Sequence, residues 1–523
     1  MIDLTTIHSV ADAIRVQARL RPNAEAVWFE GRTTTFGDLD RASNQCAQAL
    51  LAQGLKPGDR VGVLAKNIDD FFVLWFGCIK ARVTLAPVNW RLAPPEIAFI
   101  LKDAHAKVLV VGEDFGGVVD MIVGDLPDIK GLVQFEPGHS RWPAFRDWIG
   151  SHDASDPRLE VQPDDDVIQL YTSGTTGLPK GVQLTQANFL SLFELALEAG
   201  WARYEAEKTN LVVMPLFHVA GTNCGLLALL QGVRNVLTRE VSATEIIDRL
   251  QDKQVAYAFL APTIINMLLQ TPGVEHADFR RLERIFYGAS PISEAVLRQA
   301  QERFGCDFTQ LYGLTETIGA ATFLPPEDHA PERDKLRSCG KPWPGFEVRV
   351  LTPTGEPGKP GEVGEIQIRA RGVMKGYWKR PEATADAVCP QGWFSSGDAG
   401  YFDDEGYLYI YDRVKDMIVS GGENVYPAEV ENALFSHPAV ADAAVIGVPD
   451  ERWGEAVKGM VVLKPGATAT PEEIIAHTRG QIAGYKAPKT IDFIEALPRN
   501  PSGKVLRREL RAPFWEGRER LVG

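Results

Sequence analysis

Short apolar runs alternate with helix-like segments from about residue 60 to residue 325. The runs are VGVLA, VLVVG, VIQLY, LVVM, AYAFL, RIFYG and DFTQLYG, and the segments between them include 185–199 and 293–304. This alternation is typical of βαβ units, which place parallel strands in one sheet and helices on its faces. The sequence therefore predicts an α/β fold built on parallel sheet.

The sequence changes character twice further along the chain. Between residues 340 and 411, Gly- and Pro-rich turns separate short strands, which predicts a smaller antiparallel or β-barrel-like section. After Arg413 comes a Gly-rich loop at 420–424, then a helix start at Pro427 and a strand, helix and strand pattern to about residue 494. We expect this last part to be a separate α+β unit of roughly 110 residues.

Length, charge and cysteine spacing exclude several classes of protein. A chain of 523 residues with 45% hydrophobic and 24% charged residues can bury a large core and is neither disordered nor fibrous. Its net charge of -14 repels polyanions, which argues against nucleic-acid binding. The six cysteines are at least 32 residues apart, so we expect no compact disulfide framework. Residues 1–22 lack the apolar region of a signal peptide, and a cytoplasmic protein fits best.

Residues 209–233 carry no formal charge and are long enough to be considered as a membrane span. Polar residues and a proline within the stretch argue against spanning. We expect a buried strand, a loop over Pro215–Gly221 and a core helix instead. The sequence thus predicts no transmembrane segment, and it leaves open peripheral contact with a membrane and assembly as a homodimer.

A glycine-rich and hydroxyl-rich loop directly follows the apolar strand VIQL. Glycines let backbone N–H groups approach an anion, hydroxyl groups add donors, and a lysine supplies positive charge, so the loop predicts phosphate binding. A Walker A loop would continue with Ser or Thr after its lysine, and Gly181 stands there instead. The loop consists of Tyr171, Thr172, Ser173, Gly174, Thr175, Thr176, Gly177, Leu178, Pro179, Lys180 and Gly181.

Six further strings follow in order: PLFHVAG at 215–221, YGAS at 287–290, YGLTE at 312–316, WFSSGD at 393–398, DRVKDMIVSGGENVYPAEVE at 412–431 and PRNPSGKVLR at 498–507. With the loop YTSGTTGLPKG, they make nearly the whole chain resemble the acyl-adenylate-forming superfamily of acyl-CoA synthetases, luciferases and nonribosomal-peptide adenylation domains. The resemblance implies an N-terminal AMP-binding domain of residues 1–412, a hinge at 413–415 and a smaller mobile domain of 416–523.

The resemblance also implies the reaction. A carboxylate attacks the α-phosphate of ATP and releases pyrophosphate, and a thiol such as that of CoA then displaces AMP from the acyl-AMP. Two anions must be brought together in the first step, so compensation by cations is the main requirement. ATP, Mg²⁺ and CoA are the expected cofactors.

The resemblance gives roles to individual residues of the nucleotide site. Glu316 holds Mg²⁺, Thr315 contacts the α-phosphate, and Lys180 compensates phosphate charge. Lys504 reaches the carboxylate and the α-phosphate during adenylation. The remaining contacts are Tyr312 on the adenine, Gly288, Ala289 and Ser290 as the loop beside the adenine, and Asp398 and Arg413 at the ribose.

In the second half-reaction, the resemblance implies that the C-terminal domain swivels about Lys415. It then presents Gly421, Gly422 and Glu423 to the tunnel for the pantetheine arm of CoA. The chain departs from many relatives at Asp412, where they have Gly, and at Arg82-Val83, where they have Gly-Ala. We expect neither departure to abolish activity.

The expected acyl pocket is a roomy, apolar channel lined by small or apolar residues. His218 stands where amino-acid-activating relatives have an Asp, and 215–231 holds no Lys or Arg to pair with a second carboxylate. We therefore expect an apolar acid, with a medium- or long-chain fatty acid first and a cinnamate- or benzoate-type acid as the alternative. A carrier protein as acceptor, a luciferase-like oxygenase and an inactive relative are further alternatives. The pocket residues are His218, Val219, Gly221, Thr222, Gly313, Ile318 and Gly319.

Overall fold

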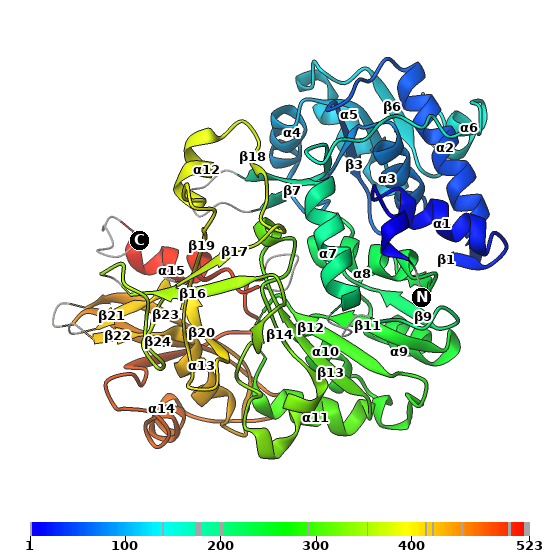
Figure 1. The fold of residues 1–523 in the computed structure, drawn as a ribbon. Coiled ribbons are helices and arrows are strands. Elements are labelled where there is room, and N and C mark those ends of the chain that lie inside the picture. Colours follow the sequence, from blue (N-terminus) through cyan, green and yellow to red (C-terminus); the bar gives the residue numbers. More distant parts are fainter. Residues whose placement is uncertain are drawn as a thin grey trace.

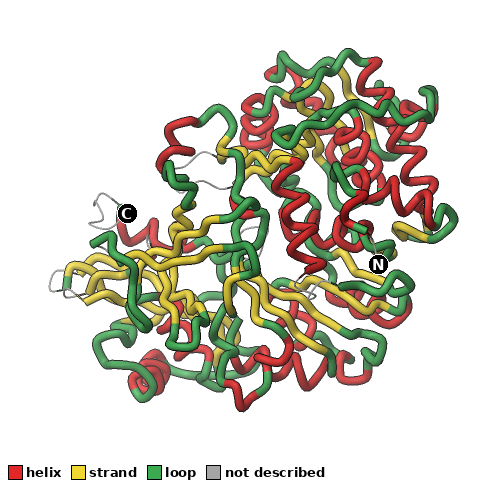
Figure 2. The backbone as a smooth tube through the Cα atoms, viewed as in Figure 1, coloured by secondary structure: helices red, strands yellow, loops and turns green. Residues whose placement is uncertain are grey.

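The strands in the described part of the chain form four sheets (Figure 1). Figure 2 shows that helices are concentrated at the upper right, in the N-terminal lobe, and that strands dominate the lower left, toward the C-terminus. The computed structural model describes residues 3–138, 141–172, 179–198, 203–290, 292–352, 354–413, 416–420, 423–450, 453–499 and 504–516.

The largest sheet has nine strands in the order β15-β14-β13-β12-β11-β9-β10-β1-β2. The strands from β13 to β1 within this order are parallel. β2 runs antiparallel to β1, β14 antiparallel to β13, and the edge strand β15 antiparallel to β14. The parallel sheet predicted from the alternating runs is thus confirmed. The strands are β1 (Glu25–Phe29), β2 (Arg32–Thr35), β9 (Thr209–Val212), β10 (Arg234–Leu237), β11 (Val255–Leu260), β12 (Arg284–Gly288), β13 (Asp307–Tyr312), β14 (Thr322–Leu324) and β15 (Lys341–Pro342).

A second sheet has seven strands in the order β18-β8-β7-β4-β3-β5-β6. Its strands β3 to β7 are parallel, whereas β8 runs antiparallel to β7 and the short β18 antiparallel to β8. The two antiparallel strands form the edge that carries the phosphate loop. The strands are β3 (Arg60–Leu64), β4 (Thr84–Pro87), β5 (Ala106–Val111), β6 (Gly131–Gln134), β7 (Asp166–Thr172), β8 (Lys180–Thr185) and β18 (Gly376–Tyr377).

One hydrophobic core joins the two large sheets through the helices between them. All eleven residues of α3 are buried, and α8 approaches α3 closely because Gly225 has no side chain: a Cβ there would stand 2.5 Å from the Phe72 ring. Figure 1 shows α7 and α8 between the upper lobe and the nine-stranded sheet. The helices are α1 (Asp12–Leu20), α2 (Phe36–Ala52), α3 (Asp70–Lys80), α4 (Pro94–Asp103), α5 (Gly116–Ile122), α6 (Phe145–Gly150), α7 (Gln186–Glu198), α8 (Val219–Leu230), α9 (Ala243–Asp252), α10 (Pro262–Leu269), α11 (Glu294–Phe304) and α12 (Pro381–Ala387).

Residues 209–233 fold as the sequence predicts, into buried strand β9, a loop and core helix α8. In the part of the chain that the structure describes, no helix is both long and apolar enough to cross a membrane. All six cysteines are free, in agreement with their spacing.

The third sheet is antiparallel, with strands in the order β16-β17-β19-β20, and agrees with the antiparallel section expected between residues 340 and 411. The fourth sheet belongs to the C-terminal unit, which has a hydrophobic core of its own. The elements are β16 (Glu347–Leu351), β17 (Gly364–Arg369), β19 (Phe394–Phe402), β20 (Leu408–Arg413), β21 (Ile418–Ser420), β22 (Glu423–Val425), α13 (Pro427–Phe435), β23 (Val440–Asp450), β24 (Gly454–Leu463), α14 (Pro471–Arg479), β25 (Thr490–Phe493) and α15 (Arg507–Trp515).

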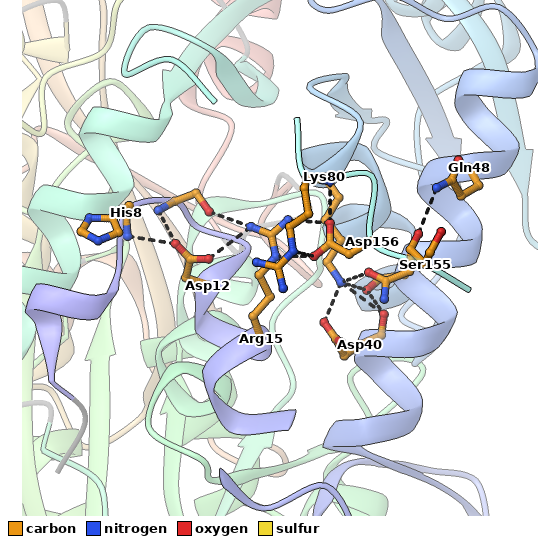
Figure 3. A network of polar contacts seen from close by, with 12 residues as sticks. His8, Asp12, Arg15, Asp40, Gln48, Lys80, Ser155 and Asp156 are labelled. Atoms are coloured by element: carbon orange, nitrogen blue, oxygen red, sulfur yellow. Dashed lines mark hydrogen bonds and ion pairs between the residues drawn. The ribbon is translucent and has the colours of Figure 1, made fainter. Parts of the chain in front are cut away.

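A buried lysine ties α3 to α2 in the N-terminal lobe (Figure 3). The Lys80 ammonium donates to Asp40 Oδ1 (2.7 Å), Ser43 Oγ (2.8 Å) and Asn44 Oδ1 (2.6 Å). Burial lowers the pKa of Lys80 to about 8, although the Asp40 carboxylate opposes the shift. Beside it, Arg15 of α1 holds Asp156 through two hydrogen bonds of 2.7 and 2.9 Å. The Arg15–Asp156 contacts fasten the connection that leads into β7.

Candidate active site

The phosphate loop joins two antiparallel strands at the edge of the seven-stranded sheet. β7 ends at Thr172, β8 begins at Lys180, and these two residues are paired directly opposite each other. Thr172 and Lys180 therefore stand on the two sides of the loop base. The other predicted phosphate-binding residues, Ser173, Gly174, Thr175, Thr176 and Gly177, lie outside the described residues.

Lys180 and Glu316, predicted to hold phosphate and metal, meet at one aromatic side chain. The Lys180 ammonium lies 5.0 Å from the centroid of the Tyr377 ring. The Tyr377 hydroxyl donates a 2.8 Å hydrogen bond to Glu316 Oε1. The structure thus brings the phosphate-loop lysine and the Glu316 carboxylate to the two ends of one tyrosine.

Glu316 is suited to hold Mg²⁺. It lies with Thr315 on the short 3₁₀-helix η5 (Thr315–Thr317) that follows β13, and it is only 8% exposed. Carboxylate oxygen is the kind of ligand that Mg²⁺ prefers, and this ion often takes one or two oxygens from protein and the rest from phosphates and water. Among the described residues no three His, Cys, Asp or Glu side chains cluster as a metal site.

The predicted adenine and ribose residues are also in contact. The Tyr312 hydroxyl, at the end of β13, donates a 2.7 Å hydrogen bond to Asp398 Oδ2 on β19. Burial and the Asp398 carboxylate both raise the pKa of Tyr312 well above its ordinary value, so Tyr312 stays a neutral donor. Asp398 is paired across the ladder with Arg413, whose side chain lies outside what the structure describes.

The loop predicted beside the adenine contains tight backbone geometry. Gly288 ends β12, and a Cβ there would stand 2.1 Å from the carbonyl oxygen of Leu311 on β13. Ala289 has a left-handed φ of 67°, which is unfavourable for a residue with a side chain. Ser290 follows at once. Left-handed residues of this kind tend to cluster at functional sites, where the surrounding structure holds them.

The predicted acyl-pocket residues come from two segments that lie side by side. Val219, Gly221 and Thr222 belong to the first turns of α8, and Gly313, Ile318 and Gly319 to the loop after β13. Asn223 joins the segments, because its Nδ2 donates a 2.7 Å hydrogen bond to the Ile318 carbonyl oxygen. Gly319 faces α8, since a Cβ there would stand 3.5 Å from both Val219 methyl groups and from Asn223 Nδ2.

His218 is the N-cap residue of helix α8, and its imidazole ring is neutral. Its Nδ1 accepts a 3.2 Å hydrogen bond from the Ala220 N–H, so the proton of the neutral ring is on Nε2. Two causes lower the pKa of His218 to about 4. Desolvation of the ring is the larger one, and the positive charge of Lys504 is the smaller one. Lys504 belongs to the C-terminal unit. The structure therefore brings the predicted catalytic lysine close to the start of the acyl pocket.

The residues predicted for the CoA tunnel and the hinge are described only in part. Ser420 of β21 and Glu423 of β22 are paired across the antiparallel ladder. Lys415, Gly421 and Gly422 lie outside the described residues, and only the backbone of Glu423 is described. The hinge at 413–415 stays a prediction.

Sequence reasoning missed Tyr377 and Asn223 as residues of the site. Tyr377 lies in the string KGYWKRPEA, which carries no phosphate or metal pattern. It reaches the site only because β18 pairs with β8. Asn223 lies four residues after Val219 on α8, and this helical spacing is the signal that could have placed it beside the pocket.

The fold and site together define a two-part adenylate-forming protein. A large α/β region carries the phosphate-loop hairpin, the Lys180–Tyr377–Glu316 cluster and the Tyr312–Asp398 pair. A separate α+β unit carries Lys504, whose charge acts on His218 at the start of α8.

The chain belongs to the AMP-binding enzyme family. It matches this family over residues 14–378 and the AMP-binding enzyme C-terminal domain over residues 429–504. It is 40% identical to a fatty acid–[acyl-carrier-protein] ligase of Streptomyces coeruleorubidus over 99% of this chain and 98% of the relative. A feruloyl-CoA synthase of an Amycolatopsis species is 38% identical over 95% of this chain and 97% of its own. Among solved structures, an anthranilate CoA ligase in complex with anthranoyl-AMP has a TM-score of 0.91 at 26% identity, covering 98% of this chain and 99% of that one.

Proposed function

We propose that this chain is an ATP-, Mg²⁺- and CoA-dependent ligase that converts an apolar carboxylic acid into its acyl-CoA through an acyl-AMP. The observation that carries the proposal is that the Tyr377 hydroxyl donates a 2.8 Å hydrogen bond to Glu316 Oε1 while the Lys180 ammonium lies 5.0 Å from the centroid of the same ring. A carboxylate suited to Mg²⁺ and a cation suited to phosphate oxygens thus stand together at the proposed nucleotide site. Membership of the AMP-binding enzyme family supports the same reaction class.

Adenylation needs positive charge where two anions meet. Lys504 lies between the acyl carboxylate and the α-phosphate and stabilises the charge that develops as the new P–O bond forms and pyrophosphate leaves. Lys180 binds phosphate oxygens from the loop side. Thr315 donates to the α-phosphate. The neutral His218 ring adds no charge and allows an uncharged acyl chain to lie against α8.

Other residues orient the nucleotide. The hydroxyls of the ribose donate to Asp398, and Arg413 contacts the ribose from the neighbouring strand. The adenine packs between Tyr312 and the loop of Gly288, Ala289 and Ser290. Mg²⁺, held by Glu316, neutralises phosphate charge when it is bound.

The thioester step uses the other face of the C-terminal unit. Rotation about the hinge at 413–415 withdraws Lys504 and brings the 421–423 loop to the pantetheine tunnel. The thiol of CoA attacks the acyl carbonyl carbon, and AMP leaves with the electrons of the C–O bond. We also propose that the N-terminal domain ends at residue 412 and that the mobile C-terminal domain begins at residue 416.

The substrate that we propose is a medium- or long-chain fatty acid. The pocket segments present Val219, Gly221, Ile318 and Gly319, which are apolar or lack a side chain. A neutral histidine, with its pKa lowered to about 4, offers no charge to pair with an α-ammonium group or a second carboxylate. The similarity to a fatty acid ligase supports this choice.

Two alternatives rest on specific relatives. An aromatic acid is supported by the similarity to a feruloyl-CoA synthase. Transfer to the phosphopantetheine arm of a carrier protein, instead of CoA, is supported by the fatty acid–[acyl-carrier-protein] ligase that shares 40% identity over 99% of this chain.

The test is AMP release from ATP and Mg²⁺ with a panel of fatty and aromatic acids, with CoA or with a phosphopantetheinylated carrier protein as acceptor. The proposal predicts AMP release that depends on a fatty acid and on CoA. Turnover only with the carrier protein would show that the acceptor is the carrier protein and not CoA. Turnover only with aromatic acids would show that the substrate is an aromatic acid and not a fatty acid. No acid-dependent AMP release with any member of the panel would contradict the ligase itself.

A further inference from the structure

The segment Met374–Arg380 links both sides of the phosphate loop to Glu316. Within it, β18 pairs with β8, with Gly376 opposite Gln183 and Tyr377 opposite Val182. Figure 1 shows β18 beside this edge of the seven-stranded sheet. The Trp378 N–H donates to the Gly181 carbonyl oxygen at 2.8 Å, one residue beyond Lys180. The segment is therefore fixed to the strand that leaves the phosphate loop.

The same segment is fixed to the strand that enters the loop. The Tyr171 hydroxyl donates to Asp103 Oδ2 at 2.8 Å, and Arg380 pairs with Asp103 Oδ1 at the same distance. Trp378 Nε1 donates to the Asp103 carbonyl oxygen at 2.9 Å, and the Arg60 guanidinium stacks 3.4 Å from the Trp378 ring centroid. These contacts leave the segment little freedom to shift relative to the loop.

Glu316 is attached at two points. The Met374 N–H donates to its backbone carbonyl oxygen at 2.7 Å, and the Tyr377 hydroxyl donates to its carboxylate at 2.8 Å. The opposite charge of Lys180 lies over the face of the same tyrosine ring. Glu316 and Lys180, both described in full, do not form an ion pair with each other.

We propose that Tyr377 is a positioning residue that holds Glu316 and Lys180 in place and keeps them from neutralising each other. The hydroxyl stabilises the carboxylate by donating a hydrogen bond, and the electron-rich ring face stabilises the ammonium. Both charges then stay available, the carboxylate for a metal ion and the ammonium for phosphate oxygens. A direct ion pair would remove both from the nucleotide. The inference rests on the proposed roles of Glu316 and Lys180, but it does not depend on which acid is activated.

The test measures nucleotide binding without any acid substrate. The probe is the α,β-methylene analogue of ATP, titrated by calorimetry into the full chain with Mg²⁺ or with a chelator. Tyr377→Phe keeps the ring and removes the hydroxyl. We expect its affinity for the Mg²⁺-nucleotide to fall about tenfold, as for loss of one hydrogen bond to a charged group, while the affinity in chelator stays as in the unmodified chain.

Tyr377→Leu removes the ring as well, so Lys180 and Glu316 can pair, and we expect the affinity in chelator to fall too. Tyr407→Phe is the matched control, because Tyr407 donates a hydrogen bond of the same 2.8 Å length to a carboxylate, that of Asp328, outside the site. It should bind the nucleotide as the unmodified chain does in both conditions. Circular dichroism checks that each variant is folded.

A double-mutant cycle isolates the pair. In a Glu316→Gln background, Tyr377→Phe should cause no further loss of Mg²⁺-dependent affinity. An unchanged Mg²⁺ dependence in Tyr377→Phe, an equal loss with and without Mg²⁺, or the same loss in Tyr407→Phe would each overturn the inference. If instead the proposed acid activation were wrong, the unmodified chain would bind the nucleotide normally but would release no AMP with any acid.

Discussion

The ammonium group of Lys504, in the C-terminal unit, lies close enough to the His218 imidazole, at the start of α8, to lower its pKa. The two residues belong to parts of the chain with separate cores. The positive charge of Lys504 therefore acts on a predicted acyl-pocket residue of the N-terminal region. This is the arrangement that the proposed adenylation step requires.

Stability should depend on pH through His329. This side chain is 2% exposed, its Nδ1 donates to the Pro325 carbonyl oxygen (2.8 Å), and its Nε2 accepts from the Tyr287 hydroxyl (2.9 Å). Burial lowers its pKa from 6.5 to about 4. As the pH falls below 6.5, the pKa of the histidine in the unfolded chain, the unfolded chain binds a proton before the folded chain does. The stabilisation by the neutral ring is thus complete above pH 6.5 and is lost as the pH falls toward 4.

The measurement is urea unfolding between these two pH values for the unmodified chain and for His329→Gln, which still offers a donor and an acceptor. We expect the variant to lose less stability on acidification, with a difference in slope of up to about 1.4 kcal/mol per pH unit. Parallel pH profiles for the two proteins would contradict a buried neutral His329.

Gly313→Ala should damage the loop that carries Glu316. A Cβ at Gly313 would stand 2.3 Å from the Ala320 nitrogen and from the Gly319 carbonyl carbon, both of them backbone atoms that cannot move aside as a side chain can. We expect a loss of about 1–3 kcal/mol in the free energy of unfolding and weaker binding of the Mg²⁺-nucleotide. Urea unfolding and calorimetry measure the two effects.

The control for this substitution is Gly117→Ala in α5, because no atom lies within 4 Å of the added Cβ and alanine favours a helix. It should be as stable as the unmodified chain or slightly more so, with unchanged nucleotide binding. If both alanine variants had the same free energy of unfolding and the same nucleotide affinity, the close backbone approach at Gly313 would not be the cause of the predicted losses.

Arg82 stands where the resemblance to the acyl-adenylate-forming superfamily leads us to expect Gly, and its backbone is left-handed, with φ of 57°. Two hydrogen bonds to Asp165, of 2.8 and 3.0 Å, hold its guanidinium. Arg82→Gly and Arg82→Ala both lose this ion pair, but only glycine relieves the left-handed backbone. We expect Arg82→Gly to be more stable than Arg82→Ala by about 1 kcal/mol in urea unfolding. A less stable glycine variant would refute this explanation of the departure.

The sequence was sufficient to predict the parallel sheets, because strands such as β3 and β11 are buried along their whole length and appear as continuous apolar runs. It also marked Lys180, Glu316 and Lys504, since each lies in a local string of recognisable chemistry. Tyr377 could not be found in this way. β18 has two residues, too few for any periodicity, and its place depends on pairing with a distant strand. The left-handed backbone of Ala289 and Ile318 likewise comes from tertiary packing and leaves no mark on residue type.

The central claim is that Lys504 serves adenylation and is not needed for thioester formation. The most direct measurement compares the two half-reactions in Lys504→Ala, using exchange of labelled pyrophosphate into ATP for the first and acyl-CoA formation from supplied acyl-AMP for the second. The exposed Lys464 of the same unit supplies the control, Lys464→Ala. We predict that Lys504→Ala loses pyrophosphate exchange by roughly 10²-fold or more, as expected for loss of one key electrostatic group, and keeps thioester formation. Normal pyrophosphate exchange in Lys504→Ala, or an equal loss in both half-reactions, would contradict the account.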